Sequence, residues 1–445
     1  MLRRSLLLVP LLYCALAQAQ SNRPNIVLIM TDDAGYGDLT SYGAPDVHTP
    51  VLDQLGREGV RFTNFYSNGP SCSPTRAGLM SGRYQQRYNI DVPLPAPSTV
   101  DGKGLTAEGH SLPALLKTAG YKTALIGKWH LGYSDAQSPQ AHGFDYFFGF
   151  KAGYVDYYQH TNSDGKPDLW EQDQLHGVDG YMTDLITQKS VSYIEQHSNA
   201  PFFLSIQYNA PHWPYQRPGQ PSVAVRNSAH LMPWEDNTST RADYVAMFEY
   251  VDRGVGEVLR ALDAAGLADN TLVIYTNDNG GEWLARNAPL FNRKLSVWEG
   301  GIRVPAMMRW PGVIPAGQVI DQVGITMDLS ATMLALSGAT LPAGYAPEGI
   351  NLLPIVSRAA PQQERTLFWS AAGTSAVRSG DLKLVQQGPS SFFVFNVSED
   401  PGERNDLTSV RQDDARRLHA LLEAWKSDVG AEGATRLPAS TKSTP

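Results

Sequence analysis

The stretch Asn25-Ile26-Val27-Leu28-Ile29-Met30 is a short, unbroken apolar run that ends just before Asp32 and Asp33. A run of this length without polar alternation is typical of a strand buried on both faces of a parallel sheet. Three later runs share the pattern: Thr123–Ile126 (TALI), Phe202–Tyr208 (FFLSIQY) and Thr271–Thr276 (TLVIYT).

Segments with a helical spacing of apolar residues separate these runs. They lie at Thr49–Glu58, Leu112–Ala119, Tyr181–Gln196 and Ala242–Ala265. Alternating strands and helices favour an α/β fold, because parallel neighbours need a crossover connection. We therefore expect one large, mostly parallel sheet sandwiched by helices.

The composition changes at residues 342–361, which hold four prolines. The apolar runs that follow are close together, as in a short antiparallel sheet, and a helical pattern at Gln412–Lys426 comes after them. We expect a signal segment at 1–19, a large domain at 20–355 and a smaller α+β subdomain at 356–445. The strands expected in the subdomain are Thr366–Ser370, Ser375–Arg378, Leu382–Gln386 and Phe392–Asn396.

The first 19 residues have the three parts of a bacterial-type export signal. Arg3 and Arg4 precede an apolar core at Ser5–Leu16, and Ala17-Gln18-Ala19 matches a cleavage motif. The core is shorter than the ~20 residues needed to span a bilayer, and no other segment is apolar enough. The sequence predicts a periplasmic or extracellular protein without a transmembrane segment after cleavage. A lipid anchor at Cys14 is a weaker alternative, because the bulky Tyr13 precedes it.

The chain is acidic, with 36 Lys and Arg against 44 Asp and Glu. Loss of Arg3 and Arg4 with the signal takes the formal net charge from −8 to −10. This charge disfavours nucleic acid and anionic lipid as partners. An anionic substrate would need a local basic pocket.

Residues capable of chemistry follow each of the four long strands. Ligands of open α/β sheets bind beyond the carboxyl ends of the strands, so these side chains should converge on one cleft. Lys128 and His130 are two residues apart and would share a face in an extended segment. The residues expected at the cleft are Asp32, Asp33, Lys128, His130, His212, Asp278 and Asn279.

Cys72 begins the most informative motif, Ser71-Cys72-Ser73-Pro74-Thr75-Arg76. Pro74 suits the first turn of a helix, which would put Cys72 at a helix N-terminus that favours anions. Arg76 follows one turn later on the same face. A helix start with an arginine can hold a tetrahedral oxyanion. Cys14 leaves with the signal, so Cys72 would be a lone thiol in an exported protein.

Residues Cys72–Arg76 resemble the C-x-P-x-R core of the type I sulfatases, which belong to the alkaline phosphatase superfamily. The match continues to Arg83. A second stretch, Gly120–His130 (GYKTALIGKWH), is similar to the family motif G-Y-x-T-x-x-x-G-K-W-H. The resemblance runs from Arg23 to about Leu407. It implies an alkaline-phosphatase-like fold and hydrolysis of sulfate esters, on sulfated carbohydrates, aryl sulfates or both.

The resemblance also implies that a formylglycine-generating enzyme oxidises Cys72 to formylglycine. One hydroxyl of the hydrated aldehyde would attack sulfur and release the alcohol. The second hydroxyl would then expel sulfate, which a serine could not do.

One Ca²⁺ ion per chain is implied as well. Asp32, Asp33, Asp278 and Asn279 would bind it together with an oxygen on residue 72. Oxygen ligands of this kind suit Ca²⁺ or Mg²⁺ better than Zn²⁺.

Roles for the remaining site residues come from the same resemblance. Lys128 would contact the sulfate and the formylglycine, and His130 would help to deprotonate the diol. His212 or Lys294, the latter in K-x-x-x-W-E-G-G, would protonate the leaving oxygen. His160 is a candidate lining residue of the substrate pocket.

Two other functions stay open. A formylglycine-dependent phosphonate or phosphodiester hydrolase of the same superfamily would share the pocket, although such relatives show Asp-His where this chain has Asp278-Asn279. A non-catalytic protein that binds sulfated glycans would keep Cys72 unmodified.

Overall fold

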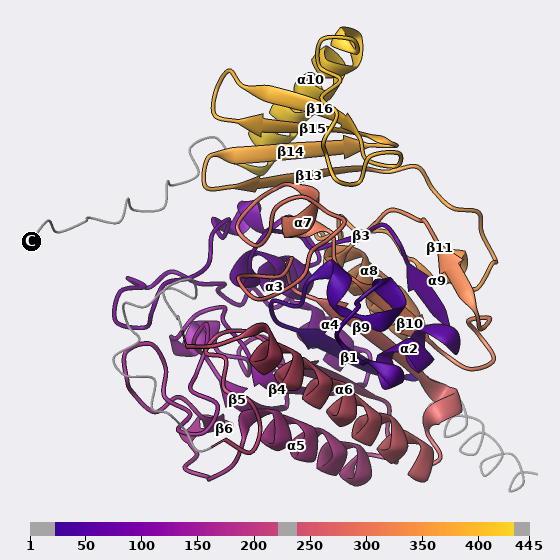
Figure 1. Cartoon of the computed structure of the whole chain (residues 1–445). Helices are drawn as coiled ribbons and strands as arrows, with labels where there is room; N and C mark the ends of the chain where they lie inside the picture. The colour runs from indigo at the N-terminus through magenta and orange to yellow at the C-terminus, as the bar shows by residue number, and fades with distance from the viewer. Residues whose placement is uncertain (1–22, 221–237, 431–445) are drawn as a thin grey trace, which may run out of the picture.

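The computed structural model describes residues 23–220 and 238–430. The expected signal segment and the Cys14 anchor lie outside the described residues. The centre of the molecule is a ten-stranded mixed sheet in the order β11-β2-β10-β9-β1-β8-β4-β5-β6-β7 (Figure 1). Its strands are β1 (Asn25–Thr31), β2 (Val60–Phe62), β4 (Lys122–Lys128), β5 (Tyr146–Phe150), β6 (Trp170–Glu171), β7 (Gln174–Leu175), β8 (Phe202–Gln207), β9 (Thr271–Asn277), β10 (Ala306–Arg309) and β11 (Gln318–Ile320).

The middle of this sheet is parallel, as the apolar runs predict. Strands β9, β1, β8, β4 and β5 are parallel neighbours. Ile29 of β1 stands between Tyr275 of β9 and Ile206 of β8. Antiparallel pairing begins on either side, at β10 and at β6. The carboxyl ends of the four long strands therefore lie at one edge of the sheet.

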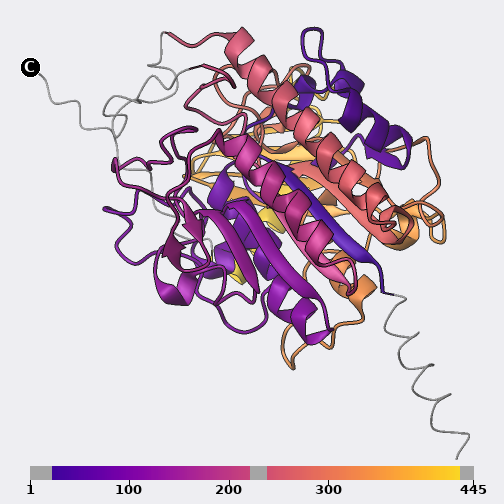
Figure 2. The same cartoon turned by 90° about the horizontal axis from the view of Figure 1, so that it is seen from below.

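Helices cover both faces of the sheet. Helices α5 and α6 run side by side across one face (Figures 1 and 2), and helices α3, α4 and α8 pack together on the other. In the described residues no helix is both long and apolar enough to span a membrane. The helices are α2 (Pro50–Arg57), α3 (Cys72–Ser81), α4 (Leu112–Thr118), α5 (Met182–Gln196), α6 (Arg241–Ala264), α7 (Glu299–Ile302), α8 (Thr326–Ser337), α9 (Leu353–Val356) and α10 (Gln412–Val429), with 3₁₀ turns at Tyr36–Asp38, Thr40–Tyr42, Gln85–Tyr88, Asp135–Gln137 and Ala268–Asn270.

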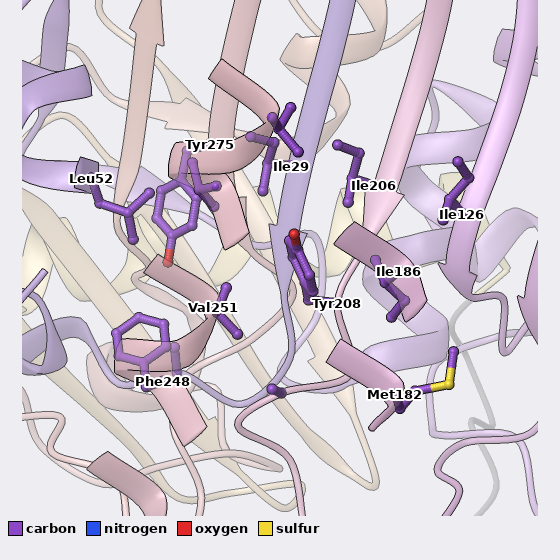
Figure 3. Close-up of a cluster of buried hydrophobic side chains, with 14 of the residues drawn as sticks. Ile29, Leu52, Ile126, Met182, Ile186, Ile206, Tyr208, Phe248, Val251 and Tyr275 are labelled. Atoms are coloured by element: carbon purple, nitrogen blue, oxygen red, sulfur yellow. The ribbon is translucent and has the colours of Figure 1, made fainter. Parts of the chain in front are cut away.

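Successive side chains of each central strand point to opposite faces of the sheet and so pack into two separate hydrophobic cores. Val27 and Ile29 of β1 belong to the core under α5 and α6, whereas Ile26 and Leu28 belong to the core under α3, α4 and α8. Figure 3 shows the first core, where Tyr208 and Ile206 lie beside Ile186 of α5. Both faces of β1 are buried, which explains its unbroken apolar sequence.

The C-terminal part forms the predicted short antiparallel sheet, with α10 packed against β14 and β15. Figure 1 shows this layer in yellow at one end of the large sheet. Its strands are β13 (Thr366–Ala371), β14 (Thr374–Ser379), β15 (Leu382–Gln387) and β16 (Phe392–Asn396); a further two-stranded sheet joins β3 (Phe65–Tyr66) to β12 (Gly324–Ile325).

The small sheet shares its core with the large part of the molecule. Trp298 and Met327 pack in one cluster with Trp369 of β13. The boundary expected after residue 355 falls inside α9, and Ile355 and Val356 both pack in the core of the large part. The two parts are thus joined by a buried interface, and the boundary stays a prediction.

Candidate active site

Helix α3 begins at Cys72, as the position of Pro74 predicts. Ser71 is extended, so the free backbone N–H groups of the first turn lie at the Cys72 end. The Cys72 side chain is buried, and its Sγ lies 3.5 Å from Oδ1 of Asp32. Burial, and after it the charge of Asp32, raises the pKa of the Cys72 thiol far above its ordinary value. The unmodified side chain is therefore a protonated thiol at neutral pH and a weak nucleophile.

Two cations flank the carboxylate of Asp32, which follows β1. Nζ of Lys128, the last residue of β4, lies 2.5 Å from its Oδ2, and Nη2 of Arg76 lies 3.9 Å from the same oxygen. All three side chains are buried. The two cations lie close enough to Cys72 to act on it electrostatically, and they would attract an anionic group there.

Arg76 is fixed by residues at the ends of β8 and β9. Its Nη2 and Nε donate to Oδ2 of Asp278 at 3.0 and 3.2 Å, and its Nη1 donates to Oε1 of Gln207 at 3.0 Å. Burial, and after it the charge of Asp32, raises the pKa of Asp278 to about 7. The arginine is thus held rigidly by acceptors from two strands.

A second group of site residues surrounds the carboxylate of Asp33. Nζ of Lys294 lies 2.7 Å from its Oδ2, and Nε2 of His212 lies 3.5 Å from that atom. Nδ2 of Asn279 donates to its Oδ1 at 2.7 Å. Burial raises the pKa of Asp33, but the charge of Lys294 outweighs that effect and holds it well below its ordinary range. Asp33 is therefore ionised, and it ties the β1, β8 and β9 ends to the Lys294 loop.

The loop that carries Lys294 is attached to the Cys72 segment. The backbone N–H of Leu295 donates to the carbonyl of Pro70 at 2.7 Å. Oε2 of Glu282 lies 3.6 Å from Nζ of Lys294, and burial raises the pKa of Glu282 to about 7. Burial alone would lower the pKa of Lys294, but Asp33 raises it well above its ordinary value. Lys294 is thus a buried cation held on the site.

His212 is a neutral ring in this arrangement. Its Nδ1 faces the backbone carbonyl of Trp213, and because a carbonyl only accepts, Nδ1 carries the hydrogen. Burial and the charge of Lys294 lower the pKa of His212 to about 3. Tyr154 stacks on the ring, with centroids 5.9 Å apart. Nε2 therefore holds a lone pair directed toward Asp33.

The expected placement of His130 is wrong in one respect. His130 has φ +56°, a left-handed conformation, so the segment is not extended and Lys128 and His130 do not share a strand face. The His130 ring turns to the carbonyl of Leu94, 3.0 Å from Nε2, while its Nδ1 is buried without a partner among the described residues. Gly153 packs so close that a Cβ there would lie 2.8 Å from Cε1 of His130. The absence of a side chain at Gly153 thus leaves room for the His130 ring.

The donor set fits a hard divalent cation. Ligand atoms of Asp32, Asp33, Cys72 and His212 lie within 4.8 Å of one another. Oδ1 of Asn279 is buried and has no hydrogen-bond partner in the described chain. Carboxylate oxygens beside an unpaired amide oxygen are ligands that Ca²⁺ accepts. The residues that would hold the ion are Asp32, Asp33, Asp278, Asn279 and an oxygen on residue 72.

Three polar residues of the site were not predicted from the sequence. Gln207 and Asn209 follow the apolar part of β8 just as Asp32 follows β1, and that position was the available signal. Glu282 follows the Asp278-Asn279 pair by a few residues but carries no motif. His160 is buried and its Nε2 faces the carbonyl of Gly180 at 3.1 Å, so its expected place in the substrate pocket stays a prediction.

Comparison with known proteins identifies the family. The family model described as "Sulfatase" matches residues 24–339. The chain belongs to the sulfatase family. A second model, "N-sulphoglucosamine sulphohydrolase, C-terminal", matches residues 288–424 and so covers the small sheet. This sulfatase thus matches family models over nearly all of its described residues.

Relatives of the sulfatase include enzymes with named substrates. N-acetylgalactosamine-6-sulfatase of Mus musculus is 34% identical over 98% of this chain and 86% of its own length. Arylsulfatase A of Bos taurus is 32% identical over 93% and 89%. A crystal structure of Ps i-CgsB in complex with k-i-k-neocarrahexaose is 29% identical, covers 94% of this chain and 96% of that chain, and superposes with a TM-score of 0.83.

Proposed function

We propose that this sulfatase hydrolyses sulfate esters with a nucleophile made from Cys72 by oxidation to formylglycine. The observation that carries the proposal is the position of Cys72, buried at the start of α3 and 3.5 Å from Asp32, with Arg76 and Lys128 beside it. A buried thiol with a raised pKa is poorly suited to act unmodified. The hydrate of a formylglycine would supply the attacking oxygen and, after transfer, the second hydroxyl that releases sulfate.

The buried cationic side chains of the site lie in two groups, one for each end of the S–O bond that would be cleaved. Arg76 and Lys128 lie on the Cys72 side, where they would hold the non-bridging oxygens and stabilise the charge that develops in transfer. Lys294 lies on the Asp33 side and carries protons. We assign the donation of a proton to the leaving oxygen to Lys294, because the neutral His212 ring keeps its hydrogen on Nδ1 toward Trp213. The Nε2 lone pair of His212 would instead accept a hydrogen bond from a donor on the substrate.

A Ca²⁺ ion at Asp32, Asp33, Asp278 and Asn279 would polarise the sulfate and favour ionisation of the nucleophile. The bound charge would also relieve the mutual repulsion that raises the pKa of Asp278.

Sulfated carbohydrates are the proposed substrate class. The relatives named above include a sulfatase named for an amino sugar and a protein crystallised with a carrageenan-type oligosaccharide. Trp283 adds support, because it is 44% exposed on the loop that carries Lys294. The guanidinium of Arg293 lies 5.3 Å from the centre of its ring. An exposed aromatic face with an adjacent cation suits a sugar ring that bears a second anionic group.

Export through residues 1–19 is part of the proposal. N-terminal sequencing of protein secreted by a bacterial host should find a start at residue 20, and a start at Met1 would contradict it.

The nucleophile is tested by mass spectrometry of the peptide that contains residue 72. We expect an aldehyde in place of the thiol in active enzyme, and Cys72→Ala should lower kcat/KM at least ~10³-fold. Fully active enzyme with an intact thiol would refute the route. The same assay with a phosphodiester substrate tests the phosphodiesterase alternative. A wild-type protein that binds a sulfated glycan but turns over no ester, with the same affinity after Cys72→Ala, would be a glycan-binding protein.

The substrate class is tested by comparing N-acetylgalactosamine 6-sulfate and sulfated oligosaccharides with a nitrophenyl sulfate. A higher kcat/KM on the saccharides is expected. Turnover of the aryl ester alone would refute the carbohydrate proposal while leaving the nucleophile intact.

A further inference from the structure

The side chain of Asn209 is buried at the site without any hydrogen bond inside the described chain. The residue is 1% exposed, and neither Oδ1 nor Nδ2 has a partner. An unpaired buried polar group destabilises the folded chain, and both polar groups of this amide are unpaired among the described residues. Asn25, at the opposite end of the sheet, shows the ordinary case: its Oδ1 accepts from the N–H of Phe202 at 3.2 Å and its Nδ2 donates to Thr271 at 3.4 Å.

The carboxyl end of β8 places Asn209 at the active-site edge of the sheet. Ile206 and Tyr208 point into the core under α5 and α6, as Figure 3 shows. Ser205 and Gln207 point to the other face, where Gln207 accepts from Arg76 at 3.0 Å. Asn209 lies two residues after Gln207, just beyond the carboxyl end of β8. It therefore stands at the edge of the sheet where Gln207 holds Arg76 and where the next residue, Ala210, contacts the backbone of Asp32.

The backbone around Asn209 is anchored on both sides, so the amide is held in place. Its carbonyl accepts from Oη of Tyr157 at 3.0 Å and from the N–H of His212 at 2.9 Å. The next carbonyl, that of Ala210, accepts from the N–H of Asp32 at 3.4 Å. Asn209 thus stands beside the segment that carries Asp32, and its backbone is fixed on both sides.

We propose that Asn209 is a substrate-binding residue, whose Nδ2–H donates to a non-bridging oxygen of the sulfuryl group. The inference rests on the proposed sulfate-ester substrate. A sulfuryl group offers only acceptor oxygens, and a neutral amide donor can bind one of them without a further charge. Arg76 and Lys128 would neutralise the negative charge of the sulfuryl group, and the hydrogen bond from Asn209 would fix its orientation. Because the same oxygens persist in the product, the bond should also form with inorganic sulfate.

The test uses the full mature chain with Cys72→Ala, in buffer that contains Ca²⁺, so that neither turnover nor the modification of residue 72 affects the readout. Titration calorimetry gives the Kd of inorganic sulfate, and urea unfolding without sulfate gives the stability. Asn209→Ala should raise the Kd about tenfold, as expected for a lost hydrogen bond to a charged group. Its unfolding free energy without sulfate should be unchanged or higher, since no internal bond is lost.

Asn25→Ala is the matched control, because it loses two internal bonds far from the site. It should lower the stability and leave the sulfate Kd unchanged. Asn209→Asp keeps the shape of the side chain and should raise the Kd more than Asn209→Ala does, because a carboxylate repels the anion.

An Asn209→Ala protein that is as destabilised as Asn25→Ala and binds sulfate normally would overturn the inference, and so would a parent protein that binds no sulfate. An intact thiol in active enzyme would refute the formylglycine route alone, since residue 72 is alanine in every protein of this test.

Discussion

Two buried clusters in this sulfatase both pair carboxylates with lysine and arginine, but they differ in how many of their polar groups have partners. At the active site, Asp32 and Asp33 are each paired with a lysine, at 2.5 and 2.7 Å, and buried amide atoms of Asn209 and Asn279 nearby have no partner in the described chain. The polar groups there exceed the partners that the protein supplies.

The second cluster joins the large part to the small sheet. Lys383 of β15 is fully buried and lies 2.8 Å from Oε1 of Glu299 and 2.9 Å from Oε1 of Glu403. The other oxygen of Glu299 accepts from Tyr66 at 2.7 Å and from Arg303 at 3.2 Å. Oε2 of Glu403 accepts from the backbone N–H of Glu299 at 2.7 Å.

The difference separates binding from structure. At the site, the carboxylates and lysines can exchange their ion pairs for contacts with a metal ion and a sulfate. In the Lys383 cluster, every described polar group has a hydrogen-bond partner within the chain except Oε1 of Glu403, which is paired with Lys383 by charge alone. Removing a charge should therefore have opposite consequences in the two places: loss of turnover at the site and loss of the fold at the interface.

The largest effect on stability is expected from Lys383→Met. It leaves two carboxylates buried side by side, and breaking a buried ion pair in this way costs about 3–5 kcal/mol. Urea unfolding would measure the loss. Lys128→Met is the matched control, since Lys128 is equally buried. With Ca²⁺ present it should cost less stability and yet abolish most turnover; equal losses of stability would erase the distinction between the clusters.

Removal of the metal should affect only the site. Saturating Ca²⁺ should stabilise chelator-treated enzyme by roughly 2–3 kcal/mol at a concentration of ~100 Kd. Asn279→Ala should remove most of this gain, because it deletes the unpaired Oδ1. Asn287→Ala lies in the same loop, but its amide is already paired with Gly281, so it should keep the gain. Stabilisation by Zn²⁺ and not by Ca²⁺ would contradict the oxygen-ligand assignment.

The sequence predicted the central strands and the chemistry at their ends because local pattern determines both. The apolar run at 25–30 and the paired aspartates after it need no distant contact to be recognised. His130 was misplaced because its left-handed backbone conformation, and the contacts of its ring with Leu94 and Gly153, involve neighbours in space that the motif does not contain. Asn209 was overlooked for a similar reason: an asparagine after a strand is an ordinary turn former, and only its burial without partners distinguishes it.

The Lys383 cluster could not be predicted at all. Lys383 lies between Leu382 and Leu384 in a short strand, an alternation that predicts a solvent-facing lysine. Its partners Glu299 and Glu403 are 84 and about 20 residues away along the chain. Only the packing of the small sheet on the large part brings the three together. A buried lysine of this kind has the same local sequence as a solvated one.

The smallest effect concerns acid stability and tests the Lys383 cluster alone. Burial raises the pKa of Glu299, but Lys383 and Arg303 outweigh it and lower the pKa to about 2. Since the ordinary value is 4.5, ionised Glu299 contributes stability that is present above pH 4.5 and is lost as the pH falls toward 2. The stability difference between wild type and Glu299→Gln should therefore shrink steadily as the pH falls across that window.

Glu403 provides a control of opposite sign within the same cluster. Burial raises its pKa to about 7, and Lys383 does not offset the effect. The contribution of protonated Glu403 to the free energy of unfolding is present below pH 4.5 and is lost as the pH rises through 7. Between those pH values the stability of Glu403→Gln should therefore increase relative to that of the wild type. Urea unfolding of both variants from pH 2.5 to 8 would measure the two windows. A change in the stability of both variants, relative to wild type, in the same direction over the same pH window would contradict this assignment. It would mean that Lys383 affects Glu299 and Glu403 equally, and that the greater number of cations around Glu299 does not lower its pKa.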